Sequence, residues 1–209
     1  GGIPALPRED IRRRFEIPSD AVVLCNIGRF SPEKGQMIAV EANLRLVARY
    51  GARAPIWLFC GDGPLLGPVR DFAASRGMTN IRFAGRVEDI DSYLGASDVF
   101  VMPSDFEGMP NAMMEAMVQS LPSVSTSRSG AIDIAREGLE ALYCPPGDPD
   151  ALASRLMALV DSPLERARIG RNAGARIGEF SVRHAVRTFD RCLHDVVAQP
   201  VSQNNPLAV

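Results

Sequence analysis

The chain has 209 residues, of which 46% are hydrophobic and 23% charged, and its formal net charge is −2. This length and composition allow one large domain to bury a core, and the nearly balanced charge argues against sequence-independent nucleic-acid binding. No apolar run approaches the roughly 20 residues that cross a bilayer, and the first residues lack the pattern of a signal peptide. We therefore expect a cytoplasmic protein with no membrane contact in this domain.

Residues 1–20 contain a short charged helix and a Pro-Ser turn, which together are typical of a linker. From there on, short apolar runs alternate with helix-like segments, which indicates β-α-β units around a parallel sheet. The first four runs are apolar throughout, as in strands that helices cover on both faces. Six strands are predicted, at 21–28, 55–61, 81–85, 99–104, 123–127 and 141–144, with helices between them at Gln36–Tyr50, 64–76 and 131–137.

The remainder of the chain is predicted to be helical, at 148–162, 163–177 and 181–198, followed by a frayed tail at 199–209. Asp148 or Asp150 is expected to cap the first of these helices, and Ser181 the last. The sequence therefore predicts one α/β domain over 21–198, with a single Rossmann-like, doubly wound parallel sheet of about six strands and C-terminal helices.

Four loops follow strands of this sheet and are candidates for a binding site, because ligands of such sheets bind beyond the carboxyl ends of the strands. Their sequences are GRFSPEKG (28–35), GDGPL (61–65), GRVED (85–89) and SDFEGMPN (104–111). Glycine at a strand exit lets backbone approach a ligand closely. For any single loop, a tight turn explains the glycine equally well.

Two of these loops suggest anion binding. Arg29 and Lys34 place two cations in the first loop, where they suit a diphosphate, although beside Glu33 they could also be ordinary surface. In the fourth loop, Asn111 is expected to cap a helix after the Pro110 turn. The first amides of that helix would then form a second, dipolar anion site facing the cations.

Several familiar motifs are not met. Gly61, Gly63 and Gly67 are spaced one residue too widely for a dinucleotide fingerprint, and GRFSPEKG lacks the ending of a phosphate-binding P-loop. DID (89–91) resembles a metal motif of some sugar transferases, but it opens a predicted helix, where aspartates act as caps. The four cysteines form no C-x-x-C pair and are expected to be reduced. No metal is predicted.

Taken together, the loops identify a resemblance. GRFSPEKG, GDGPL, the run FAGRVEDIDSYLGASDVFVMPSDFEGMPNAMMEAMVQSLPSV (83–124) and GDPDALASRL (147–156) resemble the C-terminal, donor-binding half of a family 4 retaining glycosyltransferase (glycosyl transferases group 1) with the GT-B fold. The resemblance extends over about residues 8–197. Its most specific element is the E-x7-E pair Glu107 and Glu115, whereas each other motif alone is weak.

The resemblance implies roles for the residues of the two anion-binding loops. Arg29 and Lys34 would hold the donor diphosphate and stabilise its charge as the sugar leaves. Glu107 would accept hydrogen bonds from hydroxyls of the donor sugar, and Glu115 from those of the ribose. Backbone groups of Gly108, Met109, Pro110 and Asn111 would contact the sugar and phosphate.

The resemblance also implies contacts farther along the edge. Arg86 and Val87 would hold the nucleotide base largely through backbone, and Gly28, Gly61 and Gly63 would leave room for the nucleotide. For Asp62 we prefer a turn aspartate that bonds local amides. The nucleoside diphosphate sugar is a substrate, and no cofactor is expected.

A complete enzyme of this kind has a further, amino-terminal domain that binds the acceptor, and no part of these residues resembles it. We expect a donor-binding domain that moves a hexose from a UDP- or GDP-type donor to a glycan, lipid or small-molecule acceptor and is inactive alone. The alternatives are a non-catalytic nucleotide-sugar-binding module and, less favoured, a GT-B epimerase. Any attachment to the inner membrane would be made through the missing domain.

Overall fold

The computed structural model describes residues 5–180. The chain divides into two compact units, Gly1–Ile177 and Gly178–Val209. In the second unit the description covers only the short 3₁₀ helix η3 (Gly178–Phe180). The helix predicted at 181–198 and the tail at 199–209 lie outside the described residues, and the domain boundary at residue 198 stays a prediction.

The first unit is built on a six-stranded, fully parallel sheet, which confirms the predicted fold class. Its strand order is β3-β2-β1-β4-β5-β6, so the chain reverses its direction of winding between β1 and β4. In doubly wound sheets this reversal opens a crevice at the carboxyl edge. The strands are β1 (Val23–Ile27), β2 (Ile56–Cys60), β3 (Ile81–Gly85), β4 (Val99–Met102), β5 (Ser123–Thr126) and β6 (Ala141–Cys144).

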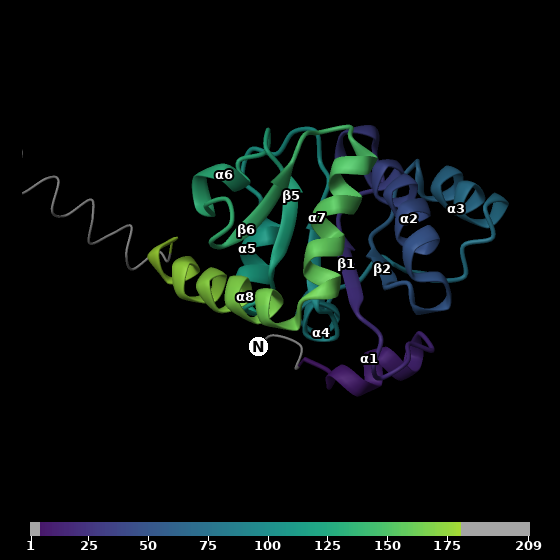
Figure 1. The fold of residues 1–209 in the computed structure, drawn as a ribbon, viewed down its shortest axis with the longest axis horizontal. Helices are drawn as coiled ribbons and strands as arrows, with labels where there is room; N and C mark the ends of the chain where they lie inside the picture. Colours follow the sequence, from purple (N-terminus) through teal and green to yellow (C-terminus); the bar gives the residue numbers. More distant parts are fainter. Residues whose placement is uncertain (1–4, 181–209) are drawn as a thin grey trace, which may run out of the picture. The chain divides into compact units, whose positions relative to one another are not determined.

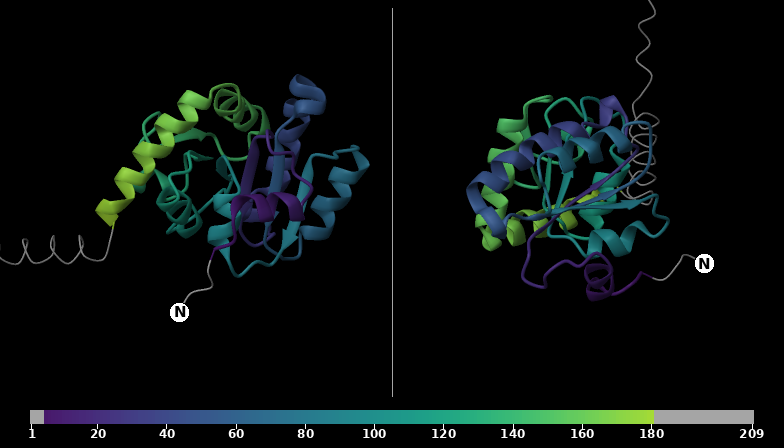
Figure 2. Two further views of the ribbon diagram at one scale, coloured as in Figure 1. Left: turned by 90° about the horizontal axis from the view of Figure 1, so that it is seen from below. Right: turned by 90° about the vertical axis from the view of Figure 1, so that its right-hand side faces the viewer.

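Helices cover both faces of the sheet (Figures 1 and 2). One apolar cluster joins Leu24 and Trp57 to helices α2, α3 and α7, and in Figure 1 α2 and α7 lie in front of the strands. The other joins Cys25 and Phe100 to α1, α4, α5 and α6 on the opposite face. Because helices bury both faces, β2, β4 and β5 are fully buried. The continuous apolar sequences of β2 and β4 predict this burial, whereas β5 is buried although its sequence is SVST.

The predicted helices that fall within residues 5–180 are present, with small shifts at their ends. The helix α2 has the predicted bounds, α3 begins two residues later than expected, and Asp148 caps α7 by accepting a hydrogen bond from the Ala151 amide at 2.8 Å. The bounds are α1 (Arg8–Arg14), α2 (Gln36–Tyr50), α3 (Leu66–Ser75), α4 (Ile90–Gly95), α5 (Asn111–Val118), α6 (Ala131–Ile134), α7 (Pro149–Asp161) and α8 (Pro163–Ile177), with 3₁₀ turns η1 (Pro32–Lys34) and η2 (Gly51–Arg53).

Two further expectations concern composition. Cys25, Cys60 and Cys144 are buried free thiols, which confirms the prediction for the cysteines that the structure describes. Within residues 5–180, none of the helices combines the length and hydropathy that a membrane span requires.

Candidate nucleotide-sugar site

A pocket of about 300 Å³ opens at the carboxyl edge where the sheet changes direction. Its walls come from the loop after β1, the loop after β4, the first turns of α5 and the start of α4. It brings together many of the site residues predicted from sequence. The lining residues are Ile27, Gly28, Lys34, Ile90, Met102, Glu107, Met109, Pro110, Asn111, Ala112 and Glu115.

An ion pair joins two residues that line this pocket, Lys34 and Glu107. The Lys34 Nζ lies 2.6 Å from the Glu107 Oε1, and the Ser104 hydroxyl donates to the same oxygen at 2.9 Å. Only 28% of the Lys34 side chain and 15% of the Glu107 side chain are exposed. Sequence analysis placed both residues in the site but did not foresee that they bind each other, nor that Ser104 takes part.

Backbone contacts between the two loops hold this pair in place. The Asp105 amide donates to the Glu33 carbonyl at 2.8 Å. Gly35 has a φ of +69°, and a Cβ added there would lie 2.1 Å from the Pro103 carbonyl oxygen. A residue with a side chain would therefore push the loops apart, so Gly35 is required for Lys34 to reach Glu107.

The prediction that Asn111 caps α5 is wrong. Pro110 is the cap residue, because its carbonyl accepts hydrogen bonds from the Met113 and Met114 amides at 2.9 and 3.0 Å, and Asn111 is the first helical residue. Its side chain makes no capping bond and instead lines the pocket. The Asn111 amide already donates to the Met109 carbonyl, so fewer free amides face the pocket than the sequence indicated.

Glu115 lies half-buried one turn into α5 and forms one wall of the pocket. Burial raises the pKa of its carboxyl, and the negative charge of Asp91 on α4 raises it further. Across the part of the chain that the structure describes, no donor is bonded to this carboxylate. A half-buried acceptor without a partner is suited to ligand hydroxyls. The sequence did not indicate the influence of Asp91 on Glu115, because only the tertiary structure brings α4 near α5.

Other predicted site residues lie outside the pocket lining. Arg29 and Arg86 are exposed, and Gly108 and Val87 do not contribute to the pocket walls. Arg29 is nevertheless anchored through its backbone, because the buried Gln36 side chain donates to the Arg29 carbonyl at 3.0 Å. Its backbone is therefore held next to Gly28, which lines the pocket.

Gly61 and Gly63 have a structural explanation. Both have positive φ angles, and a Cβ on Gly61 would lie 1.9 Å from the Gly28 carbonyl oxygen, while one on Gly63 would lie 2.5 Å from that of Phe30. They allow the loop after β2 to pack against the loop after β1. Asp62 accepts a hydrogen bond from the Gly63 amide at 2.7 Å, which confirms the turn role expected for it.

The residues 89–91 behave as a helix start. Asp89 caps α4 by accepting a hydrogen bond from the Ser92 amide at 3.2 Å. Across residues 5–180, no group of three or more histidine, cysteine, aspartate or glutamate side chains is arranged to hold a metal ion. Of the side chains that line the pocket, Lys34 carries a positive charge.

Comparison with known proteins agrees with this fold. The sequence profile of the family Glycosyl transferases group 1 matches residues 7–176. The chain belongs to this glycosyltransferase family, as its motifs indicated. It is 33% identical over 172 residues to the lipopolysaccharide core biosynthesis glycosyltransferase LpsE of Rhizobium meliloti, and 30% identical over 184 residues to the 2-deoxystreptamine glucosyltransferase of Streptomyces kanamyceticus. These matches cover 81% and 85% of this chain but only 49% and 46% of the relatives.

Solved structures share the fold at lower identity. The C-terminal domain of the group 1 glycosyl transferase LpcC from Francisella tularensis superposes with a TM-score of 0.75 at 21% identity, covering 86% of this chain and 95% of that domain. Anabaena Alr3699/HepE in complex with UDP gives a TM-score of 0.76 at 21% identity, covering 91% of this chain and 52% of that one. The chain thus spans about half the length of its relatives and has the fold of one half of a GT-B enzyme.

Proposed function

We propose that this chain is the donor-binding half of a retaining glycosyltransferase that moves a hexose from a UDP- or GDP-linked donor to a glycan, lipid or small-molecule acceptor. The observation that carries the proposal is the pocket at the strand-order reversal, in which Lys34, Glu107 and Glu115 meet. Two relatives support a nucleotide-sugar ligand. The solved HepE complex contains UDP, and an Escherichia coli relative at 25% identity is named as a galactosyltransferase that uses UDP-Gal.

Each polar group of the site has a task in this proposal. Lys34 and Arg29 bind the diphosphate and stabilise the negative charge that grows on it as the glycosidic bond breaks. The half-buried Glu115 accepts hydrogen bonds from the ribose hydroxyls, and Glu107 accepts them from the donor sugar. The two glutamates thus bind opposite parts of one ligand, and they do not form an acid–base pair of the glycosidase kind.

The acceptor site belongs to the other half of the enzyme in this proposal. The chain covers 49% of LpsE and 95% of an isolated C-terminal domain, which supports an amino-terminal partner domain of similar size. The chain alone would then bind the donor weakly, because it contacts the nucleotide from one side, and would not transfer sugar. The groups at the base end, including Arg86 and Val87, would contact the nucleobase from this side.

Isothermal titration calorimetry tests the donor site directly. We expect UDP or GDP and the matching sugar nucleotide to bind the chain weakly, and Glu115→Ala to weaken both. If no nucleoside diphosphate gives heat at millimolar concentration, the donor-site assignment is wrong. Joining the chain to the amino-terminal half of its parent protein should restore transfer, whereas a non-catalytic binding module would bind the nucleotide sugar and still transfer nothing.

A further inference from the structure

The ion pair between Lys34 and Glu107 joins two side chains that the proposed function assigns to different parts of one ligand. Lys34 is assigned to the diphosphate and Glu107 to the sugar, yet in the structure their charged atoms lie 2.6 Å apart. The pair occupies one of the three N–H donors of Lys34 and the Oε1 of Glu107 within the protein. A diphosphate that attracts the Lys34 ammonium therefore competes with Glu107 for it.

Few groups near Glu107 could replace Lys34 as a counter-charge. Its carboxylate is 15% exposed, and its other side-chain contact is the neutral Ser104 hydroxyl at 2.9 Å. Arg128, the basic residue on the neighbouring loop after β5, instead faces Asp105 at 4.0 Å beside a different pocket. Within the described residues, no second cation contacts Glu107. Moving Lys34 away thus leaves a largely buried carboxylate without a counter-charge, which is unfavourable.

The donor and the product of the proposed reaction differ in how they compensate Glu107. A nucleoside diphosphate draws Lys34 toward its phosphates and offers no sugar hydroxyls, so Glu107 loses its partner and faces a second anion. A nucleotide sugar also draws Lys34, but its sugar hydroxyls donate hydrogen bonds to Glu107 in exchange. Charge-assisted hydrogen bonds of this kind are among the stronger ones.

We propose that the Lys34–Glu107 pair makes this site discriminate against the nucleoside diphosphate product and in favour of the sugar-bearing donor. The inference rests on the proposed function, because that function assigns the two ligand parts. After transfer removes the sugar, Glu107 competes with the phosphates for Lys34. The re-formed pair promotes release of the product and closes the cycle at the state seen in the structure.

Calorimetry with matched ligands tests the exchange. The wild-type chain, Glu107→Gln, Lys34→Met and the double variant are titrated with UDP and UDP-glucose, and with GDP and GDP-mannose as a second pair. Glu107→Gln keeps the shape of the side chain and removes its charge. We expect it to bind the nucleoside diphosphate about three-fold more tightly or better and the nucleotide sugar more weakly. In the Lys34→Met background, the gain for the diphosphate should vanish.

Asp105→Asn is the matched control, because it removes the same charge from the same loop. Its carboxylate faces Arg128 beside a pocket of about 400 Å³ that contains neither Lys34 nor Glu107, so it should leave the ratio of the two affinities unchanged. Equal tightening by Asp105→Asn would reduce the effect to long-range charge and overturn the exchange. Unchanged or weaker binding of the diphosphate by Glu107→Gln would also overturn the exchange. Thermal melts verify that each variant is folded. If the wild-type chain binds no nucleotide at all, the proposed function itself fails, and this inference fails with it.

Discussion

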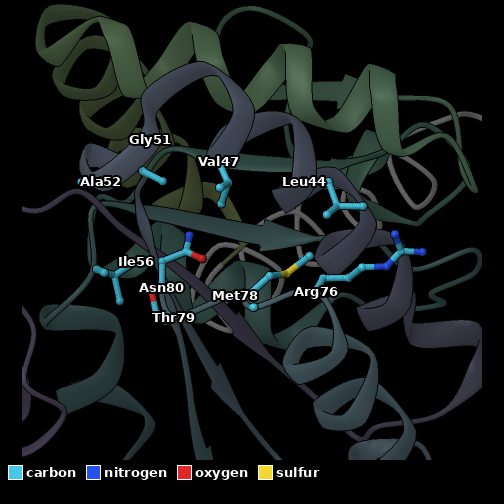
Figure 3. Close-up of a pocket in the computed structure, with 11 residues that line it drawn as sticks. Leu44, Val47, Gly51, Ala52, Ile56, Arg76, Met78, Thr79 and Asn80 are labelled. Atoms are coloured by element: carbon cyan, nitrogen blue, oxygen red, sulfur yellow. The ribbon is translucent and has the colours of Figure 1, made fainter.

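Two pockets lie at opposite edges of the sheet, one at the amino ends of β2 and β3 and the other at the carboxyl ends of β1 and β4. The polar groups at the two edges differ in whether they have partners within the protein. The amino-edge pocket holds about 160 Å³ and is lined mainly by apolar side chains such as Leu44, Val47 and Ile56 (Figure 3). The polar Asn80 in its wall is bonded within the protein, because it donates to the Asn43 side chain at 2.9 Å and to the Pro55 carbonyl at 2.8 Å.

A second cluster at the amino edge consists of charged groups that are likewise bonded within the protein. Asp98, just before β4, accepts hydrogen bonds from Arg8, Arg12 and the Val23 amide at 2.6, 2.9 and 2.8 Å. The buried Arg12 also donates to the carbonyls of residues 18, 19, 21 and 96. This network ties α1 to the domain and leaves its polar groups satisfied.

At the carboxyl edge, by contrast, polar groups are left available. Glu115 has no partner among the described residues, the Gln36 Oε1 is buried without one, and Arg29 is exposed. Lys34 and Glu107, which pair inside the candidate site, are the charged groups that the proposed ligand would draw apart. Unsatisfied polar groups are costly to a fold. The Ser123 hydroxyl at the start of β5 is also buried without a partner, but the charged groups Asp98 and Arg12 are paired. The comparison therefore assigns stability to the charge network of the amino edge and binding to the carboxyl edge.

The largest expected effect comes from the amino edge. Asp98→Ala leaves Arg12 buried without its counter-charge and should lower the free energy of unfolding by about 3 kcal/mol, with nucleotide affinity unchanged. Chemical denaturation and calorimetry measure the two quantities. Asp161→Ala, which removes an exposed partner of Arg49, is the control and should cost under about 1 kcal/mol. If Asp98→Ala lost nucleotide affinity without losing stability, the assignment of the amino edge to stability would be wrong.

Glu115→Ala should have the opposite effect, because it should change nucleotide affinity and not disrupt the fold. It removes the acceptor that we assign to the ribose, so it should weaken nucleoside diphosphate and nucleotide sugar alike by about 2 kcal/mol. Calorimetry with UDP or GDP and the matching sugar nucleotide measures this loss. Asp91→Asn, a charge change on α4 outside the pocket lining, should leave both affinities nearly intact. Unequal losses for the two ligands would contradict a ribose contact.

The same carboxylate should reduce stability when no ligand is bound. Because burial raises the pKa of Glu115 above its ordinary value of 4.5, the folded domain holds this proton more tightly than the unfolded chain. Its contribution to stability is therefore present below about pH 4.5 and is lost as the pH rises through the raised pKa. Glu115→Gln should raise Tm at pH 7 and leave it nearly unchanged at pH 4. Equal shifts at both pH values would show that the carboxylate charge is not the cause.

The smallest expected effect is that of a chelator. Lys34, Arg29 and the start of α5 supply the positive charge and dipoles that we assign to the diphosphate, so nucleotide affinity should not change when EDTA is added. A ten-fold loss, which equals about 1.4 kcal/mol, would instead assign a metal to residues 89–91. Asp89→Asn would then show the same loss without the chelator.

The elements that local sequence determines were predictable. Continuous apolar runs located the first four strands, and their alternation with helix-like segments indicated α2 at its observed bounds. The turn at Asp62 and the cap at Asp148, one of the two aspartates expected there, followed from short-range hydrogen bonding. The E-x7-E spacing also placed Glu107 and Glu115 on one loop and helix. The prediction of the cap of α5 failed, because the Pro110 carbonyl, one residue earlier, accepts the hydrogen bonds of the Met113 and Met114 amides in place of the Asn111 side chain.

Tertiary structure alone decided how the distant groups pair. Lys34 meets Glu107 across 73 residues because the sheet order places β4 beside β1, and the passage of Gly61 against the Gly28 carbonyl depends on the neighbouring β1 and β2. Asp98 likewise gathers arginines that lie more than 80 residues earlier. Local patterns specify which residues form strands and helices, whereas the order of the strands sets which loops meet, and with it which charges neutralise each other and which remain for a ligand.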